Sequence, residues 1–529
     1  MNESLRRLLQ KSRWTVYTVL GTLVAATFLI SASNLAYDGL GRFDAVFAMN
    51  QSVMEPMEVD EEAVGCDAFR EKIVHFDLKG IPPKVAYYSE IFPLLEKLRV
   101  SGILMEYEDM FPFTSDLAVV ARENAYTIEE IHEICRLAHQ HHLEVIPLVQ
   151  TFGHLEFVLK HERFSHLREV PLKIDTICPS DSRSHDLIHE MLKQIYRVHS
   201  EAINLTTIHI GADEAWSIAQ DERCRQRLSS QLGNSTDRLK ASHISSVAQF
   251  VKDQLGVPRV LVWNDMFDKV DWNLMNEYEL GRLVVPNIWG YIPDVTREGY
   301  FPAGMFERYS HTFNKILFAS AFKGANGVDQ NFISMKRYMA NLYSYVALCR
   351  ANQEHIENRI SGIILTGWQR YNHELPLCEL LPVGIPTLVA ELLLLNGNDY
   401  SVAEDSIIES ALRFLKCDSS VFRATFSHNG HSYVSPVDTQ FATCEFPGRE
   451  IFVEIEKLRF VVWKIENFDQ KRLTEEKKKI LQEIDKIEEN IKPLLEKYFY
   501  KPDIEEWLAV NFNKYRTFED KGATPARLH

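Results

Sequence analysis

The sequence lacks the patterns by which many metal and nucleic-acid-binding proteins are recognised. Its eight cysteines contain no Cys-x-x-Cys pair and no Cys/His ligand spacing, so we expect no metal site. Their even number permits disulfides without establishing any. Basic residues are fewer than acidic ones: 58 Lys and Arg against 74 Asp and Glu give a net charge of −16. This balance argues against a nucleic-acid partner, which needs clustered Lys and Arg, and favours a neutral or cationic one.

No glycine-rich fingerprint for a dinucleotide follows the first strand that the sequence predicts, and we expect no cofactor of any kind. The chain is rich in apolar residues. Hydrophobic residues make up 46% and charged residues 25% of its 529 positions. A chain of this length and composition can bury a large core and has room for more than one domain.

The N-terminus has the pattern of a membrane anchor. Residues 1–13 are basic and residues 14–37 carry no charge. The apolar part of this uncharged run approaches the ~20 residues that a spanning helix needs. The excess of basic residues predicts a cytosolic tail at 1–13, a signal-anchor transmembrane helix at 14–37 and a lumenal remainder. We therefore expect a single-pass type II membrane protein of the secretory pathway, in the Golgi. A signal peptide cleaved near residues 31–33 is the alternative.

Residues 38–69 are rich in acids and show no apolar period, so they predict a flexible stalk between membrane and globular part. Asn50, Asn204 and Asn234 begin Asn-x-Ser/Thr sequons, which only a lumenal domain could have glycosylated.

From about residue 70, short apolar runs alternate with amphipathic helical patterns, as in parallel α/β proteins. Eight runs predict strands: Ile73–Asp77, Ile103–Tyr107, Glu144–Leu148, Ile208–Gly211, Val260–Trp263, Val284–Trp289, Ile316–Ala321 and Gly362–Trp368. One intervening helix is introduced by Thr127 with Glu130 three residues later, the pattern of a capping box. Eight such units predict an α/β fold, a (β/α)8 TIM barrel over 70–395. A doubly wound sheet would alternate similarly but lacks its glycine fingerprint here.

The alternation stops near residue 395, and residues 396–529 predict a mainly helical C-terminal region. Ile480, Ile484, Ile487, Ile491 and Leu494 recur every three or four positions among Lys and Glu, as on one face of a helix. This stripe is expected to pack on the barrel or on a neighbouring helix. A homodimer seam is the alternative, although the run is short and meets a proline.

The stretch Thr207–Trp216 contains the most distinctive acids of the chain. An apolar run ends at Gly211 and is followed at once by Asp213 and Glu214, as when a buried strand places carboxylates at its C-terminal end. On an extended backbone neighbouring side chains point to opposite sides, so the two acids should diverge. The alternative is an acidic N-terminal cap of the following helix.

Other polar residues and several tryptophans lie at the C-terminal ends of predicted strands or just beyond them, where a TIM barrel has its active site. They are Asp77, Glu106, Glu108, Asp109, His154, Trp263, Asp265, Trp289 and Trp368. Carboxylates bind hydroxyl groups and indole rings stack on pyranose faces, so the set predicts a sugar site. For any one tryptophan, core packing is an equal alternative.

These residues resemble glycoside hydrolase family 20, the β-N-acetylhexosaminidases, and in particular the hexosaminidases of D type. The resemblance spans about residues 70–395. The motifs that match, in chain order, are Leu78–Lys84, Glu108–Pro112, Tyr126–Thr127, Ile146–Pro147, Phe152–His154, His209–Glu214 and Thr366–Tyr371.

The resemblance implies a retaining exo-β-N-acetylhexosaminidase that removes terminal β-linked GalNAc or GlcNAc from glycans, with GalNAc favoured by the D type. Glu214 would be the general acid, and the substrate's own acetamido oxygen the nucleophile, oriented by Asp213. His154 would belong to a hydrogen-bond network behind the acids, and Asp265 would bind ring hydroxyls. Other substrate-binding candidates are Asp77, Asp109, Trp263, Trp289, Trp368 and Tyr371.

Two departures from the family pattern concern substrate binding. An arginine that binds ring hydroxyls shortly after the first strand of the lysosomal-type enzymes has no counterpart near Gly80, where Lys79 is adjacent. The tyrosine at the end of their seventh strand, which binds the acetamido oxygen, is also missing, and Tyr371 is the substitute candidate. Two other functions stay open: a Golgi glycosyltransferase, although no Asp-x-Asp is present, and a catalytically silent carbohydrate-binding barrel.

Overall fold

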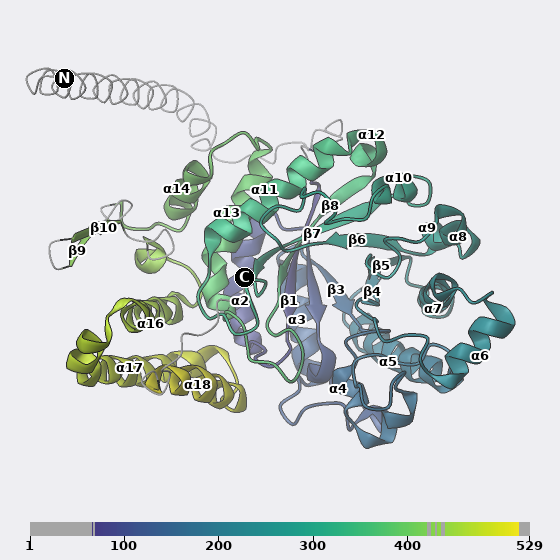
Figure 1. Cartoon of the computed structure of the whole chain (residues 1–529), viewed down its shortest axis with the longest axis horizontal. Helices are drawn as coiled ribbons and strands as arrows, with labels where there is room; N and C mark the ends of the chain where they lie inside the picture. The colour runs from purple at the N-terminus through teal and green to yellow at the C-terminus, as the bar shows by residue number, and fades with distance from the viewer. Residues whose placement is uncertain (1–65, 67–68, 420–424, 429–430, 435–439, 518–529) are drawn as a thin grey trace, which may run out of the picture. The chain divides into compact units, whose positions relative to one another are not determined.

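The computed structural model describes residues 66, 69–419, 425–428, 431–434 and 440–517 (Figure 1). The predicted tail at 1–13, the predicted membrane helix at 14–37, most of the predicted stalk and Asn50 lie outside these residues. Among the described helices, none is long and apolar enough to cross a membrane.

Eight parallel strands close into a barrel in chain order, and β1 pairs with β8 to complete it. Figure 1 shows the strands at the centre of this unit with helices around them. The strands are β1 (Glu71–Asp77), β2 (Gly102–Glu106), β3 (Glu144–Leu148), β4 (Thr207–His209), β5 (Arg259–Trp263), β6 (Val285–Trp289), β7 (Ile316–Lys323) and β8 (Ile360–Gly367). The predicted (β/α)8 barrel is thus confirmed.

Helices follow the strands as the alternation predicts. They are α2 (Val85–Lys97), α3 (Ile128–Gln140), α4 (Glu156–Leu159), α5 (Ser182–Ser200), α6 (Glu222–Gln231), α7 (Thr236–Gln249), α8 (Trp272–Glu277), α9 (Leu280–Leu283), α10 (Met305–Ser310), α11 (Met335–Ala351), α12 (Gln353–Ile356) and α13 (Leu381–Gly397). The capping box of α3 is present, since Thr127 Oγ1 accepts from Glu130 N at 3.1 Å and Glu130 Oε2 accepts from Thr127 N at 2.8 Å.

The core has two layers, as expected for a barrel whose interior is filled by side chains. The interior layer contains Ile73, Leu104, Ile146, Leu148, Leu261, Trp263, Leu317, Ala319 and Ile364. A larger apolar layer lies between the outer faces of the strands and the helices. Trp263, 1% exposed, ends β5, packs in the interior layer and also lines the cavity at the carboxyl ends of the strands.

The described part of the C-terminal region contains α14 (Glu404–Phe414), a hairpin of β9 (Thr425–His428) and β10 (His431–Val434), then α16 (Arg449–Asn467), α17 (Gln470–Tyr498) and α18 (Lys501–Arg516). The apolar stripe of α17 is buried within the chain, where α17 contacts α16 and α18. Leu495, not the predicted Leu494, follows Ile491 in the stripe, which continues to Tyr498, because the helix runs through Pro493 in α-helical period. The stripe therefore gives no support to a homodimer seam.

The end of the predicted stalk belongs to the folded unit. Cys66 forms a disulfide with Cys349 of α11, and Phe69 is 2% exposed. A second disulfide joins Cys417 and Cys444 in the C-terminal region.

Candidate active site

A cavity of about 460 Å³ opens at the carboxyl ends of the strands, within the ~300–1,000 Å³ usual for small-molecule sites. Its lining residues are Lys79, Glu106, Gln150, His154, Glu156, Asp175, Asp213, Glu214, Trp216, Trp263, Trp289, Tyr291, Gly324, Ala325, Trp368, Arg370, Tyr371, Asn372 and Leu375. Seven of the ten predicted site residues are in this set. Asp77, Asp109 and Asp265 are not.

Asp213 and Glu214 converge on one imidazole. His154 Nε2 lies 3.3 Å from Asp213 Oδ2 and 3.1 Å from Glu214 Oε2. The expectation that the two acids diverge on an extended strand was wrong, because β4 ends at His209, two residues earlier than predicted. Gly211, Ala212 and Glu214 then have φ of 59°, 65° and 47°, and this left-handed backbone turns both carboxyl groups toward the same side.

The turn is held by a close approach of the loop after β3. A Cβ added at Gly153 would lie 2.2 Å from the Asp213 carbonyl oxygen, and one added at Gly211 would lie 2.1 Å from Gln150 Oε1. Only glycine fits at either position. The two glycines bring His154 within reach of both acids.

The three groups share protons unequally. Burial by itself would lower the pKa of His154, but contact with Asp213 and Glu214 outweighs it and raises the pKa well above its usual value. The hydrogen bond from His154 in turn lowers the pKa of Glu214. In the free protein the proton therefore resides on His154.

Asp265 does not line the cavity but binds two residues that do. Its Oδ2 accepts from the backbone N–H of Glu214 at 2.8 Å and its Oδ1 from Trp289 Nε1 at 3.0 Å. Burial, followed by the nearby charge of Asp213, raises the pKa of Asp265 to about 7. The two carboxyl oxygens of Asp265 thus position the Glu214 backbone and the Trp289 indole.

Asp77 and Asp109 are also engaged by the protein. Asp77 Oδ1 accepts from the Lys79 backbone N–H at 2.9 Å, and its Oδ2 accepts from Gln369 N at 2.7 Å. Asp109 Oδ2 lies 3.4 Å from Lys160 Nζ. Asp77 thereby joins the ends of β1 and β8, and both side chains are buried.

Tyr291 is a pocket residue that the sequence reasoning missed. It lies two positions after Trp289, and the two rings stack with centroids 5.5 Å apart. Its hydroxyl is buried without a partner of good hydrogen-bond geometry among the described residues. Burial raises its pKa well above its usual value, against a smaller opposite effect of Thr366 and Trp368, so the hydroxyl stays protonated. Its place just beyond a strand end was a usable signal. By comparison, Tyr371 is 39% exposed and its hydroxyl already accepts from Gly327 N at 3.2 Å.

Arg370 is the second pocket residue that was missed. Its guanidinium carbon lies 3.0 Å from where a Cβ of Gly80 would be, so it fills the space beside the first strand where the sequence shows no arginine. Arg370 pairs with Glu506 of α18. No local sequence signal places it there, since it comes from the opposite end of the barrel sequence and depends on a C-terminal helix.

Several polar atoms of the lining residues have no partner among the described residues. They are Gln150 Oε1, Asp213 Oδ1, Trp263 Nε1, Tyr291 Oη, Trp368 Nε1 and Arg370 Nε. Buried polar groups are nearly always hydrogen-bonded, so donors and acceptors left open around a cavity mark atoms that a polar ligand would satisfy. With Trp263 and Trp368 at 5.9 Å between centroids, the cavity combines aromatic faces with convergent polar groups. Its lining contains no cysteine.

Comparison with known proteins agrees with this geometry. Residues 104–298 match the family described as glycosyl hydrolase family 20, catalytic domain. A hexosaminidase D of Bos taurus is 40% identical over 353 residues, covering 66% of this chain and 99% of that protein. A hexosaminidase D of Homo sapiens is 41% identical over 341 residues, covering 64% of this chain and 68% of that protein.

Among solved structures, a family 20 exo-β-N-acetylglucosaminidase of Vibrio harveyi is similar at 16% identity and a TM-score of 0.46, covering 66% of this chain and 58% of that one. The similarity to the bovine relative extends over nearly its whole length. By that similarity, together with the matched catalytic domain, this chain belongs to glycosyl hydrolase family 20 and is a glycoside hydrolase.

Proposed function

We propose that the chain is a retaining exo-β-N-acetylhexosaminidase that removes terminal β-linked GalNAc, or GlcNAc, by substrate-assisted catalysis. One observation carries this proposal: an open acceptor, Asp213 Oδ1, and an open donor, Tyr291 Oη, line the same cavity as the Glu214–His154 pair. A 2-acetamido group offers the complementary N–H and C=O. A sugar with a plain 2-hydroxyl would leave one of these buried atoms unpaired, at a cost of about 1–3 kcal/mol.

In the first step the acetamido oxygen attacks the anomeric carbon as the glycosidic bond breaks. Asp213 accepts a hydrogen bond from the acetamido N–H and stabilises the positive charge that develops on nitrogen, while the Tyr291 hydroxyl orients the acetamido oxygen. Glu214 gives a proton to the departing oxygen. Water then attacks the anomeric carbon of the cyclic oxazolinium, Glu214 accepts its proton, and the acetamido group is restored. Two inversions at the anomeric carbon produce net retention.

His154 supplies the proton that Glu214 delivers. In the free protein the proton is on the imidazole, and a leaving-group oxygen at Glu214 would draw it across the 3.1 Å contact. Asp265 is a positioning residue, because it holds the Glu214 backbone and the Trp289 indole.

The sugar ring is held between aromatic and cationic groups. Trp263, Trp289 and Trp368 offer ring faces and indole N–H donors, and Arg370 takes the hydroxyl-binding role of the arginine that is absent near Gly80. Preference for GalNAc over GlcNAc rests on the resemblance to the D type. Turnover of the two aryl β-glycosides, measured side by side, tests this preference.

The activity is tested with the purified full-length chain and an aryl β-N-acetylhexosaminide, without sugar nucleotide or added metal. We expect hydrolysis with retention and tight inhibition by a thiazoline analogue of the cyclised intermediate. Turnover of glycosides that lack the acetamido group, or a trapped glycosyl-enzyme adduct, contradicts the mechanism. Strict dependence on a nucleotide sugar supports the glycosyltransferase alternative, and binding without turnover supports the silent barrel.

The proposed location is a type II membrane protein of the Golgi with a lumenal catalytic domain. Support comes from the uncharged run at 14–37 behind a basic tail and from the Cys66–Cys349 and Cys417–Cys444 disulfides, since structural disulfides belong to oxidising compartments. Asn204 and Asn234 are both exposed, as glycosylation requires.

A further inference from the structure

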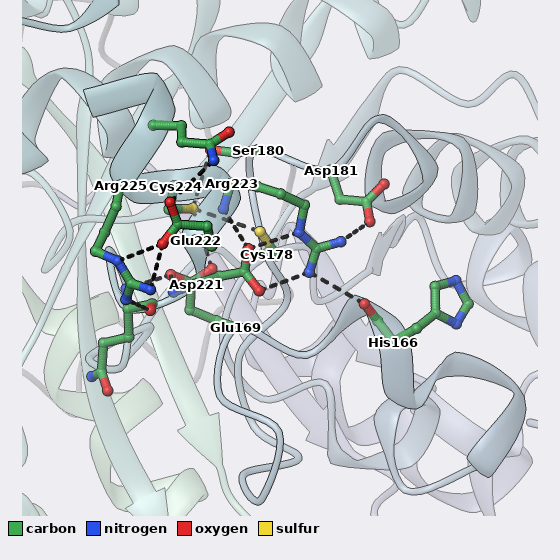
Figure 2. A network of polar contacts seen from close by, with 12 residues as sticks. His166, Glu169, Cys178, Ser180, Asp181, Asp221, Glu222, Arg223, Cys224 and Arg225 are labelled. Carbon is green, nitrogen blue, oxygen red and sulfur yellow. Dashed lines mark hydrogen bonds and ion pairs between the residues drawn. The ribbon is translucent and has the colours of Figure 1, made fainter. Parts of the chain in front are cut away.

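Three buried side chains from two segments meet, as Figure 2 shows, and none of the three lines the cavity. The oxygen or sulfur atoms of Glu169, Cys178 and Cys224 lie within 4.8 Å of one another. The two sulfurs are 3.6 Å apart, and the Cys224 thiol donates to Glu169 Oε2 at 3.2 Å. We infer that Cys178 and Cys224 are a site of covalent modification and form a third disulfide of this chain.

The folded backbone brings the two cysteines together without help from a bond between them. Cys178 is anchored by its backbone N–H, which donates to Leu167 O at 2.8 Å. Cys224 lies in the first turn of α6, whose N-cap Asp221 accepts from Arg223 N at 2.7 Å.

An ion network fastens the two segments to each other. Arg223 pairs with Asp221 of its own segment and with Asp181, which caps α5 just after Cys178. Two thiols held in contact in this way react as an intramolecular pair, at high effective concentration.

Glu169 is placed to take the proton of the Cys224 thiol. Its Oε1 accepts from the backbone N–H groups of Gln220 and Asp221 at 2.7 and 3.0 Å, and its Oε2 is directed at the Cys224 thiol. The carboxylate is therefore a fixed base beside that sulfur. A thiolate, not a thiol, is the nucleophile in disulfide exchange.

The reaction takes place while the chain folds, because both sulfurs are fully buried afterwards. The Cys224 proton passes to Glu169, and the thiolate attacks a disulfide of low molecular weight or of an oxidoreductase, forming a mixed disulfide and releasing one thiol. Cys178, after losing its proton, attacks Cys224 Sγ and releases the second thiol. The cysteine pair loses two electrons and two protons, which the oxidant carries away. The oxidant is the one element that rests on the proposed lumenal location.

The bond would join the two loops that build one wall of the cavity. The loop after β3 supplies His154 and Asp175, and the loop after β4 supplies Asp213, Glu214 and Trp216. Closing a chain segment of 46 residues restricts the unfolded state and fixes these loops relative to each other.

The experiment counts thiols in the full-length chain, isolated from the secretory membranes of cells alkylated before lysis and then denatured without reductant. Of the eight cysteines, three disulfides leave two thiols, those of Cys135 and Cys378, whereas two disulfides leave four. We expect two, and a non-reduced digest should contain a peptide that links Cys178 to Cys224.

Variants make the count specific. Cys178→Ser should raise it from two to three, because Cys224 is then unpaired, and it should lower Tm. Cys135→Ser, at a buried thiol elsewhere in the fold, should lower the count to one. Neither count depends on catalysis, so hydrolase activity measured on the same preparations tests the proposed function separately.

Four thiols overturn the inference, whether the pair is free or holds a metal such as zinc, which metal analysis of the native protein would identify. Eight thiols overturn it together with the proposed lumenal location. A digest in which Cys178 is linked to a different cysteine overturns it as well.

Discussion

Asp213 and Glu214 are neighbours in the chain and differ in the atoms they present to the cavity. Asp213 Oδ1 has no partner among the described residues, whereas the Glu214 carboxyl is bound by His154 on one side and open to the cavity on the other. Replacing Asp213 should therefore change the activity in a different way from replacing Glu214.

In the proposed mechanism, replacing Glu214 with Gln removes the proton donor and leaves the acetamido nucleophile in place. We expect kcat on poor leaving groups to fall about 10²–10⁴-fold, the range for general-acid catalysis, with a much smaller loss on dinitrophenyl glycosides. Replacing Asp213 with Asn should lower kcat similarly on all substrates, because the nucleophile is misoriented. A leaving-group dependence that is equal in the two variants would contradict these roles.

His154 should set the alkaline limb of the pH profile. Its pKa is raised, so the His154–Glu214 pair keeps its one proton until the pH passes that value, and activity falls as pH rises further. In His154→Asn the proton must be held by Glu214 itself, and an ordinary carboxyl titrates about two units below imidazole.

We therefore expect the alkaline limb of kcat/KM to move to lower pH by roughly one unit or more in His154→Asn. His132→Asn, at a ring on α3 that contacts Val198 O, is the control and should leave the limb in place. An unchanged limb in His154→Asn, with kcat merely reduced, would leave His154 with a structural role alone.

Tyr291 and Tyr371 are the two candidates for binding the acetamido oxygen in the proposed mechanism, and their hydroxyls differ. Tyr291 Oη is buried without a partner, whereas Tyr371 Oη is bound to Gly327. Tyr291→Phe should lower kcat by about 10²-fold, as for the loss of one preorganised donor, and weaken thiazoline binding in parallel. Tyr371→Phe should change both by less than about threefold, since a half-exposed hydrogen bond contributes little. The reverse order would assign the role to Tyr371.

At the scale of elements, α18 supports the cavity from the C-terminal region. Asp503 pairs with Arg122 after β2, and Glu506 pairs with Arg370 after β8. The helical region thus does more than cover apolar surface: it orients a cation that lines the substrate cavity.

Glu506→Gln should raise KM about two- to fivefold with little change in kcat, because a partly exposed ion pair contributes about 0.2–1 kcal/mol and acts here through Arg370. Glu505→Gln is the matched control, since that neighbour faces Lys501 on the same helix at 3.7 Å. Both variants are compared by steady-state kinetics and by Tm. Equal KM values in the two variants would show that α18 does not position Arg370.

At the scale of the whole molecule, the proposed topology predicts glycosylation at Asn204 and Asn234, two exposed sequons in the catalytic unit. Digestion with an endoglycosidase should increase mobility on a gel, and Asn204→Gln and Asn234→Gln should each remove part of the shift. Extraction with carbonate should leave the full-length chain in the membrane pellet. Release into the supernatant, or no change in mobility, would contradict the lumenal, anchored location.

The amino-acid sequence by itself determined the barrel, the order of its strands and most of the cavity. These features depend on local apolar periods and on strand ends, both of which can be read along the chain. The acids after β4, His154 and the tryptophans were found because each lies at a strand end or just beyond one, and strand ends of a parallel barrel meet at one face.

Only the tertiary structure decided how these residues face one another. Left-handed residues at Gly211, Ala212 and Glu214 turned two acids that should diverge toward one histidine. Arg370 beside Gly80, and Cys178 beside Cys224, are contacts between distant parts of the chain. No period or spacing encodes such contacts, because they result from how packed strands, loops and helices bring separate segments within a few ångströms.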